Sequence, residues 1–177
     1  MFFQDEARFG RIDSVSSCWV PPGGRDKVGC QVVREYTYVY MAVCPETGEN
    51  FSLILPYANG QCMDIFLKEI SKFFKKYRIV MAMDRAAWHS EEKTKKYKNI
   101  VPLFQPPYSP EVNPVESVWN YIRENGGFTC TAYKVRSKNA TFDTLKDIEL
   151  KLVENLKKMD KETIKSITLF RWIKDDV

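Results

Sequence analysis

The chain has 177 residues, one histidine and a net charge of +4, from 27 basic and 23 acidic residues. Its apolar fraction of 44% and charged fraction of 28% are those of an average soluble domain, which excludes a disordered or fibrous chain. The sequence contains neither a membrane-spanning run of about 18 apolar residues nor a signal peptide, so we expect a cytoplasmic protein.

The cysteines and the histidine limit the kinds of metal site that the chain can build. Its five cysteines are scattered, without the paired spacing of a zinc site or of a disulfide framework. We therefore expect reduced, mostly buried thiols. The single histidine excludes zinc and redox sites built from several histidines. Any metal site must depend mainly on carboxylates.

The first half of the chain has the pattern of β-strands. Several segments are rich in β-branched and aromatic residues, as strands are. A turn at residues 45–48 joins the segments 36–44 and 51–56, which predicts a hairpin. The predicted strands are an apolar start at 1–4, two short strands around Trp19 and Val32, and the segments 36–44 and 51–56.

From residue 61 the spacing of the apolar residues changes from that of strands to that of a helix. Apolar residues recur at helical spacing over 61–77, and an apolar run at 78–83 then predicts a strand covered on both faces, ending at Asp84. Strands combined with a packed helix predict an α/β layered domain.

The second half alternates short segments with helices. A charged helix at 91–99 and a strand at 100–104 precede a proline-rich loop at 105–110 that cannot be helical. Asn113 as N-cap and Pro114 at the first position then predict a helix that carries Glu116 in its first turn and ends at Gly126. Further helices are predicted at 141–159 and 161–172.

Three acids occupy positions that rigid elements hold. Asp5 follows the first apolar run, Asp84 follows the most apolar strand, and Glu116 begins a helix. Convergent carboxylates can hold hard cations such as Mg²⁺, and two such ions promote in-line phosphoryl displacement. On position alone the acids also fit turn residues and a partner for the Asn113 cap.

Three blocks of sequence then resemble, in order, the signature blocks of mariner-like DDE transposases. They are FQDEARFG at residues 3–10, MDRAAWHS at 83–90 and PPYSPEVNPVE at 106–116. The similarity extends over nearly the whole chain, including Trp19–Gly23 and Trp119, and is closest to the bacterial insertion-sequence branch.

The resemblance implies an RNase H-like α/β fold, with a central mixed five-stranded sheet flanked by helices. It further implies a catalytic triad of Asp5, Asp84 and Glu116 that binds two Mg²⁺ or Mn²⁺ ions. In such enzymes water attacks a phosphodiester at the transposon end, and the freed 3′-hydroxyl then attacks target DNA. The expected location is the bacterial cytosol, associated with the nucleoid.

Family members also carry an N-terminal helix-turn-helix region that reads the transposon ends. Asp5 lies almost at the start of this chain. We therefore expect residues 1–177 to form a single catalytic domain, with the end-reading region absent and supplied by a separate polypeptide or segment. Because two transposon ends must be brought together, the resemblance also implies a homodimer in the DNA complex.

Several other residues are candidates for DNA contact, and most of them also have a structural alternative. Arg8 and His89 lie near the acids and suit a phosphate or water, but equally a salt bridge or a cap. Arg85 stands where relatives often have a small or amide residue, and suits either a phosphate or the surface. The remaining candidates are Tyr108, which either stacks on a base or packs under its loop, and the loop residues Lys134, Arg136 and Lys138.

Two other functions remain open from the sequence. One is a catalytically inactive or accessory transposase remnant that binds DNA or a partner chain. The other is a different RNase H-like nuclease, which cleavage of RNA in RNA–DNA hybrids would distinguish.

Overall fold

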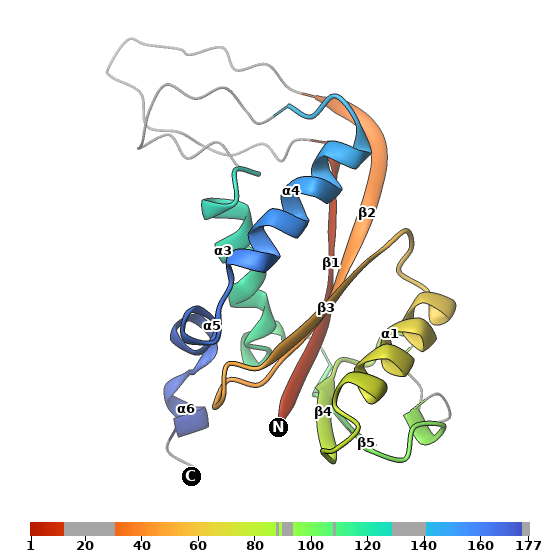
Figure 1. The fold of residues 1–177 in the computed structure, drawn as a ribbon, viewed down its shortest axis with the longest axis vertical. Coiled ribbons are helices and arrows are strands. Elements are labelled where there is room, and N and C mark those ends of the chain that lie inside the picture. The colour runs from red at the N-terminus through yellow and green to blue at the C-terminus, as the bar shows by residue number, and fades with distance from the viewer. Residues whose placement is uncertain (13–30, 88, 90–93, 108, 129–140, 175–177) are drawn as a thin grey trace.

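A mixed five-stranded sheet forms the centre of the molecule (Figure 1). The computed structural model describes residues 1–12, 31–87, 89, 94–107, 109–128 and 141–174. The strand order is β3-β2-β1-β4-β5. β1, β4 and β5 are parallel, and β2 runs antiparallel to both β1 and β3. The strands are β1 (Phe2–Ile12), β2 (Val32–Val43), β3 (Asn50–Leu55), β4 (Ile79–Met83) and β5 (Ile100–Phe104).

The predicted hairpin joins β2 and β3. Its turn is closed by hydrogen bonds from the Cys44 amide to the Glu49 carbonyl, at 2.7 Å, and from the Gly48 amide to the Cys44 carbonyl, at 2.8 Å. Gly48 has φ of +73°, a conformation that glycine adopts without strain.

Two strands differ from the sequence prediction. β1 extends to Ile12 instead of stopping at residue 4. Beyond residue 4, buried apolar residues still alternate with charged ones, and the strand remains paired with β2. Val32 begins β2 instead of marking a separate short strand. The strand predicted around Trp19 lies outside the described residues.

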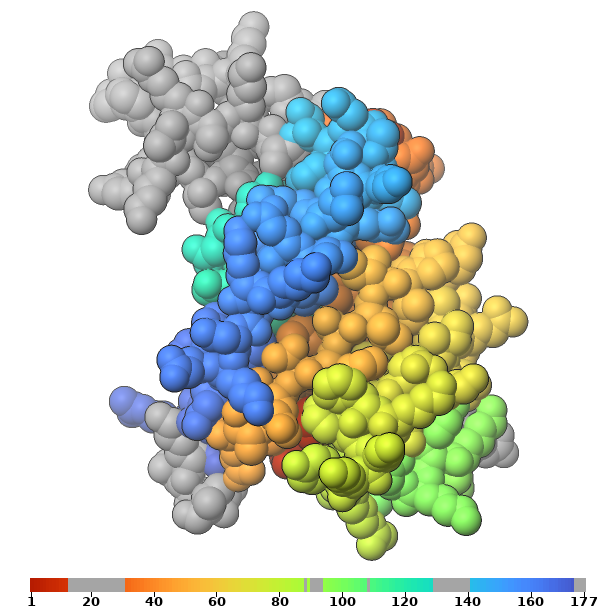
Figure 2. Space-filling model, in the orientation of Figure 1, coloured from red at the N-terminus to blue at the C-terminus, as the bar shows by residue number. Residues whose placement is uncertain are grey.

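Helices cover both faces of the sheet (Figure 1). On one face lies α1 (Gly60–Phe73), capped by Asn59, whose side chain accepts from the amides of Gln61 and Cys62. On the other lie α3 (Val115–Asn125), α4 (Leu145–Lys158) and α5 (Lys161–Thr168), with the short η1 (Pro110–Val112) before α3 and α6 (Arg171–Lys174) after α5. In Figure 2 the yellow-green α1 and the blue α4 and α5 lie on either side of the orange β2–β3 hairpin.

The helix boundaries correct several predicted spans. α1 ends at Phe73 instead of 77. α4 begins four residues later than predicted, because Thr144 and Asp147 form a capping box at its start. The final helix is two helices, broken at residues 169–170. Of the helix predicted at 91–99, residues 91–93 lie outside the description, and only 94 and 95 of the rest are helical.

Alternating residues of each strand feed two hydrophobic cores. Phe3, Ala7 and Phe9 of β1 pack with α3, α4 and α5, whereas Phe2 belongs to the core under α1. Because successive strand residues point to opposite faces, position 5 shares the face of Phe3 and Ala7. Asp5 is therefore directed towards α3.

Two further observations bear on the sequence expectations. Cys44 and Cys62 are buried free thiols, as expected, and the other three cysteines lie outside the described residues. Within the described part of the chain, every helix is too short or too polar to cross a membrane.

Candidate metal and DNA-processing site

The first candidate acid, Asp5, lies where β1 and β4 separate. It is inside β1, not at its end, because the strand continues to Ile12. β1 pairs with β4 only through Phe2 and Phe3, so the space beside Asp5 is left open on that edge. Ligands of α/β sheets commonly bind beyond the carboxyl ends of parallel strands, where the strand order reverses. β1 is that point, since β2 and β4 flank it.

The second acid, Asp84, stands next to Asp5 in the register of the sheet. Phe3 is paired with Ala82, and Asp5 and Asp84 each lie two residues further along. Both acids therefore belong to the face that packs against α3. The amide of Ala86 donates to Asp84 Oδ1 at 2.9 Å, which holds the carboxylate at the start of the loop after β4.

The third acid, Glu116, is the second residue of α3, because that helix begins one residue later than predicted. Pro114 is the N-cap instead of the predicted Asn113, and it makes no side-chain capping bond. Asn113, one residue earlier, accepts through Oδ1 from the Val115 amide at 3.2 Å. Its Nδ2 donates to the Gln4 carbonyl at 3.2 Å. Asn113 thereby fixes the start of α3 against β1, immediately beside Asp5.

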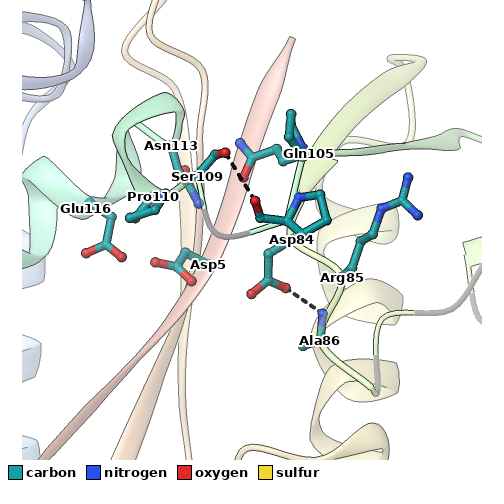
Figure 3. Close-up of a pocket in the computed structure, with 11 residues that line it drawn as sticks. Asp5, Asp84, Arg85, Ala86, Gln105, Ser109, Pro110, Asn113 and Glu116 are labelled. Carbon is teal, nitrogen blue, oxygen red and sulfur yellow. Dashed lines mark hydrogen bonds between the residues drawn. The ribbon is translucent and has the colours of Figure 1, made fainter.

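The three acids line one cavity of about 400 Å³. In Figure 3 Asp5, from β1, lies between Glu116, from α3, and Asp84, from the loop after β4. The other lining residues include Arg85, Ala86, Gln105, Ser109, Pro110 and Asn113. Among the residues that the structure describes, no three histidine, cysteine, aspartate or glutamate side chains form a ready-made ligand cluster for one ion.

The electrostatics of Asp5 are unfavourable for its ionised form. Burial raises the pKa of Asp5 to about 7, and the neighbouring Glu116 carboxylate acts in the same direction. A hydrogen bond from Trp119 Nε1 to Asp5 Oδ2, at 2.9 Å, opposes the rise. A cation bound beside Asp5 and Glu116 would relieve both the desolvation and the repulsion.

His89 is enclosed between two carboxylates. Its side chain is 1% exposed, and Nδ1 lies 2.6 Å from Asp84 Oδ1 while Nε2 lies 2.8 Å from Glu6 Oε1. Burial alone would lower the pKa of His89, but the hydrogen bonds with Asp84 and Glu6 raise it to about 10. The contact with His89 in turn holds the pKa of Asp84 below its ordinary value, although burial opposes this.

The other candidates for DNA contact are not gathered in one place. Arg85 is exposed and lines the cavity, with its side chain pointing away from the three acids in Figure 3. Arg8 is exposed, with Cζ 4.6 Å from the centre of the Tyr36 ring. The enclosed position of His89 matches the salt-bridge alternative rather than direct contact with DNA. Tyr108, Lys134, Arg136 and Lys138 lie outside the described residues.

Sequence reasoning did not identify two partners of the acids. Glu6 has no role in the sequence prediction. The available signal was strand alternation, which places the side chains of Asp5 and Glu6 on opposite faces of the sheet. Trp119 lies on the buried face of α3 and is 1% exposed. Its indole N–H requires a partner when buried, and that requirement pointed to a nearby acceptor.

Comparison with known sequences gives a family match. Residues 1–127 match the profile of a family described as DDE superfamily endonuclease. A curated protein of Sinorhizobium fredii (strain NBRC 101917 / NGR234), described as uncharacterized protein y4pE/y4sA, is 41% identical over 91 residues. The aligned part covers 51% of this chain and 67% of that protein.

Comparison with solved structures matches Mos1 transposase. The Mos1 paired-end complex with the left transposon end has a TM-score of 0.67 at 15% identity, covering 94% of this chain and 50% of that one. The Mos1 mariner paired end complex with Mn gives 0.67 at 14% identity, covering 94% and 51%. This chain thus spans about half the length of the Mos1 chains. The likeness confirms the expected RNase H-like fold.

Proposed function

The chain belongs to the DDE superfamily endonuclease family, whose profile it matches over residues 1–127, and we propose that it is the catalytic domain of a transposase. It would cut DNA at transposon ends and join the freed ends to target DNA. The observation that carries the proposal is the lining of one cavity by Asp5, Asp84 and Glu116, the three acids of the ordered sequence blocks.

Asp5, Asp84 and Glu116 are the residues that would hold the metal. All three offer carboxylate oxygens, the ligands that Mg²⁺ and Mn²⁺ prefer. A Mg²⁺ ion keeps several waters and uses only one or two protein carboxylates together with substrate phosphates. Three acids spread along one cavity therefore suit two ions shared with DNA better than one fully enclosed ion. Bound there, divalent cations would stabilise the attacking and leaving oxygens of a phosphodiester displacement.

The surrounding residues fix and orient the acids. Trp119 orients Asp5 through Oδ2, and Asn113 holds α3, which carries Glu116, against β1. The open edge between β1 and β4 would admit a DNA phosphate to the acids. Arg85, which is exposed and lines the cavity, would contact a DNA phosphate.

The partners of this domain are further parts of the proposal. Its DNA substrates would be a transposon end, as in the named Mos1 complex, and a target duplex. A separate polypeptide or segment would read the end, and two copies of the domain would act in one DNA complex. The location would be the bacterial cytosol, on the nucleoid.

DNA cleavage with a defined metal supply tests the proposal. The chain, with and without an end-binding segment, is incubated with plasmid DNA carrying the ends of its element, in Mg²⁺, Mn²⁺ or EDTA. We expect strand cleavage that requires the metal. Asp84→Asn should reduce it by more than about 100-fold, beyond the usual effect of losing a neighbour of a metal ligand.

The matched control is Asp64→Asn, at a partly exposed aspartate bonded to Lys96 and Tyr97, away from the cavity. It should cleave as the wild type does. Cleavage in EDTA, or undiminished cleavage by Asp84→Asn, contradicts the proposal. Preferential cleavage of RNA in an RNA–DNA hybrid would instead indicate another RNase H-like nuclease, and Mn²⁺ binding without any cleavage would indicate an inactive or accessory domain.

A further inference from the structure

A chain of contacts leads from β1 to the second acid through His89. Glu6 is the residue after Asp5, so its side chain leaves β1 on the opposite face. Glu6 Oε1 lies 2.8 Å from Nε2 of His89, and Nδ1 of the same ring lies 2.6 Å from Asp84 Oδ1. The bridge therefore connects two of the three sequence blocks behind the cavity.

Glu6 and His89 are the buried members of this bridge, and their polar groups need partners inside the protein. The side chains of Glu6 and His89 are 7% and 1% exposed, whereas that of Asp84 is 55% exposed. A buried charge is costly unless it is paired, and removal of one partner leaves the other uncompensated. Glu6 thus compensates the burial of the His89 ring and anchors it in place beside Asp84.

The bridge also divides the two oxygens of Asp84 between different tasks. Oδ1 accepts from the Ala86 amide at 2.9 Å and lies 2.6 Å from His89 Nδ1. Within the described contacts, Oδ2 is the oxygen left for an external ligand. A carboxylate held at one oxygen by two donors has little freedom to rotate, so Oδ2 keeps one direction.

We propose that Glu6 and His89 are positioning residues that hold Asp84 by Oδ1 and present Oδ2 to a divalent cation in the cavity. Nδ1 of the ring carries the contact that orients Asp84, and Glu6 anchors the ring through Nε2. The inference rests on the proposed function, because it takes Asp84 as a metal ligand. It assigns a task to two residues that the acid triad itself does not include.

Two substitutions of His89 separate the two ring contacts. The amide nitrogen of asparagine occupies about the place of Nδ1, so His89→Asn keeps a donor towards Asp84 and loses Glu6. The amide nitrogen of glutamine occupies about the place of Nε2, so His89→Gln keeps Glu6 and loses Asp84. A merely structural role would affect stability and metal binding in parallel in both variants.

The experiment measures Mn²⁺ affinity of the full chain without DNA, from the free-Mn²⁺ signal in electron paramagnetic resonance. Stability is measured separately by urea unfolding in EDTA. We expect His89→Gln to weaken Mn²⁺ binding by about 10–100-fold, and His89→Asn to stay within about threefold of the wild type. Glu6→Ala should also weaken binding, because the imidazole ring, unlike the shorter asparagine amide, then loses the Glu6 oxygen that anchors it at Nε2. Glu154→Gln, an exposed carboxylate bonded to two lysines, is the matched control and should leave affinity unchanged.

Three results would overturn the proposal. They are undiminished Mn²⁺ affinity in His89→Gln, an equal loss in both histidine variants, and absence of Mn²⁺ binding by the wild type. Failure of the proposed function is distinguishable from these results. A wild type that binds Mn²⁺ with the expected order of variants but cleaves no DNA would leave the positioning role standing and remove the transposase activity.

Discussion

Replacing Asp5 by asparagine should stabilise the metal-free protein, and increasingly so as the pH rises. The pKa of Asp5 is about 7 in the folded protein and has a reference value of 3.8. Between pH 3.8 and about pH 7, Asp5 keeps its proton in the folded state but has released it in the unfolded chain. Asp5 therefore lowers the free energy of unfolding progressively as the pH rises through this range. Asparagine cannot ionise, and its side-chain oxygen can still accept from Trp119. At about 1.4 kcal/mol per pH unit, the gain is about 2 kcal/mol near pH 5 and about 4 kcal/mol near pH 8, as an upper estimate.

Urea unfolding in EDTA at both pH values measures this difference. The control is Asp143→Asn, at an exposed aspartate in the segment before α4, and it should change stability by less than about 0.5 kcal/mol. The expected signature is growth of the Asp5→Asn advantage with pH. An advantage independent of pH, or a less stable variant near pH 8, would refute the argument that Asp5 is strained by burial and by Glu116. Confirmation would mean that the site lowers stability in the absence of a cation.

Two further predictions concern the residues that hold the acids. Trp119→Phe retains most of the buried ring but removes the donor to Asp5, so calorimetry should show Mn²⁺ affinity lowered by about tenfold; an unchanged affinity would contradict the orienting role. Asn113→Ala removes both the acceptor for the Val115 amide and the donor to the Gln4 carbonyl, so urea unfolding should show a loss of about 1–3 kcal/mol. A loss below about 0.5 kcal/mol would show that α3 is held against β1 by packing alone.

The fold was predictable where apolar pattern and turn chemistry agree. The β2–β3 hairpin, α1, β4, β5 and α3 all follow from such local signals. β1 was underestimated because Asp5, Glu6 and Arg8 interrupt its apolar pattern, although pairing with β2 supports the strand as far as Ile12. The strand order is a long-range property that periodicity does not contain, and here it followed from the family resemblance.

The proximity of the three candidate acids was predictable from the sequence blocks, whereas the hydrogen-bond partners of these acids were not. The sequence blocks gave Asp5, Asp84 and Glu116, and the cavity brings these three together. The contact of Glu6 depends on the face of β1 from which its side chain leaves, and the contact of Trp119 depends on how α3 packs against β1. Those are tertiary properties, so no local motif reveals that one acid is bonded to an indole and another to an imidazole.

The position of bound Mn²⁺ would show whether Asp5, Asp84 and Glu116 form a metal site. Crystals of the chain soaked in Mn²⁺ and measured at the manganese absorption edge would place the ion by its anomalous scattering. We expect anomalous density in the cavity, in contact with carboxylate oxygens of Asp5, Asp84 and Glu116, and its loss in Asp84→Asn crystals. Manganese bound only elsewhere, with this cavity empty, would contradict this expectation.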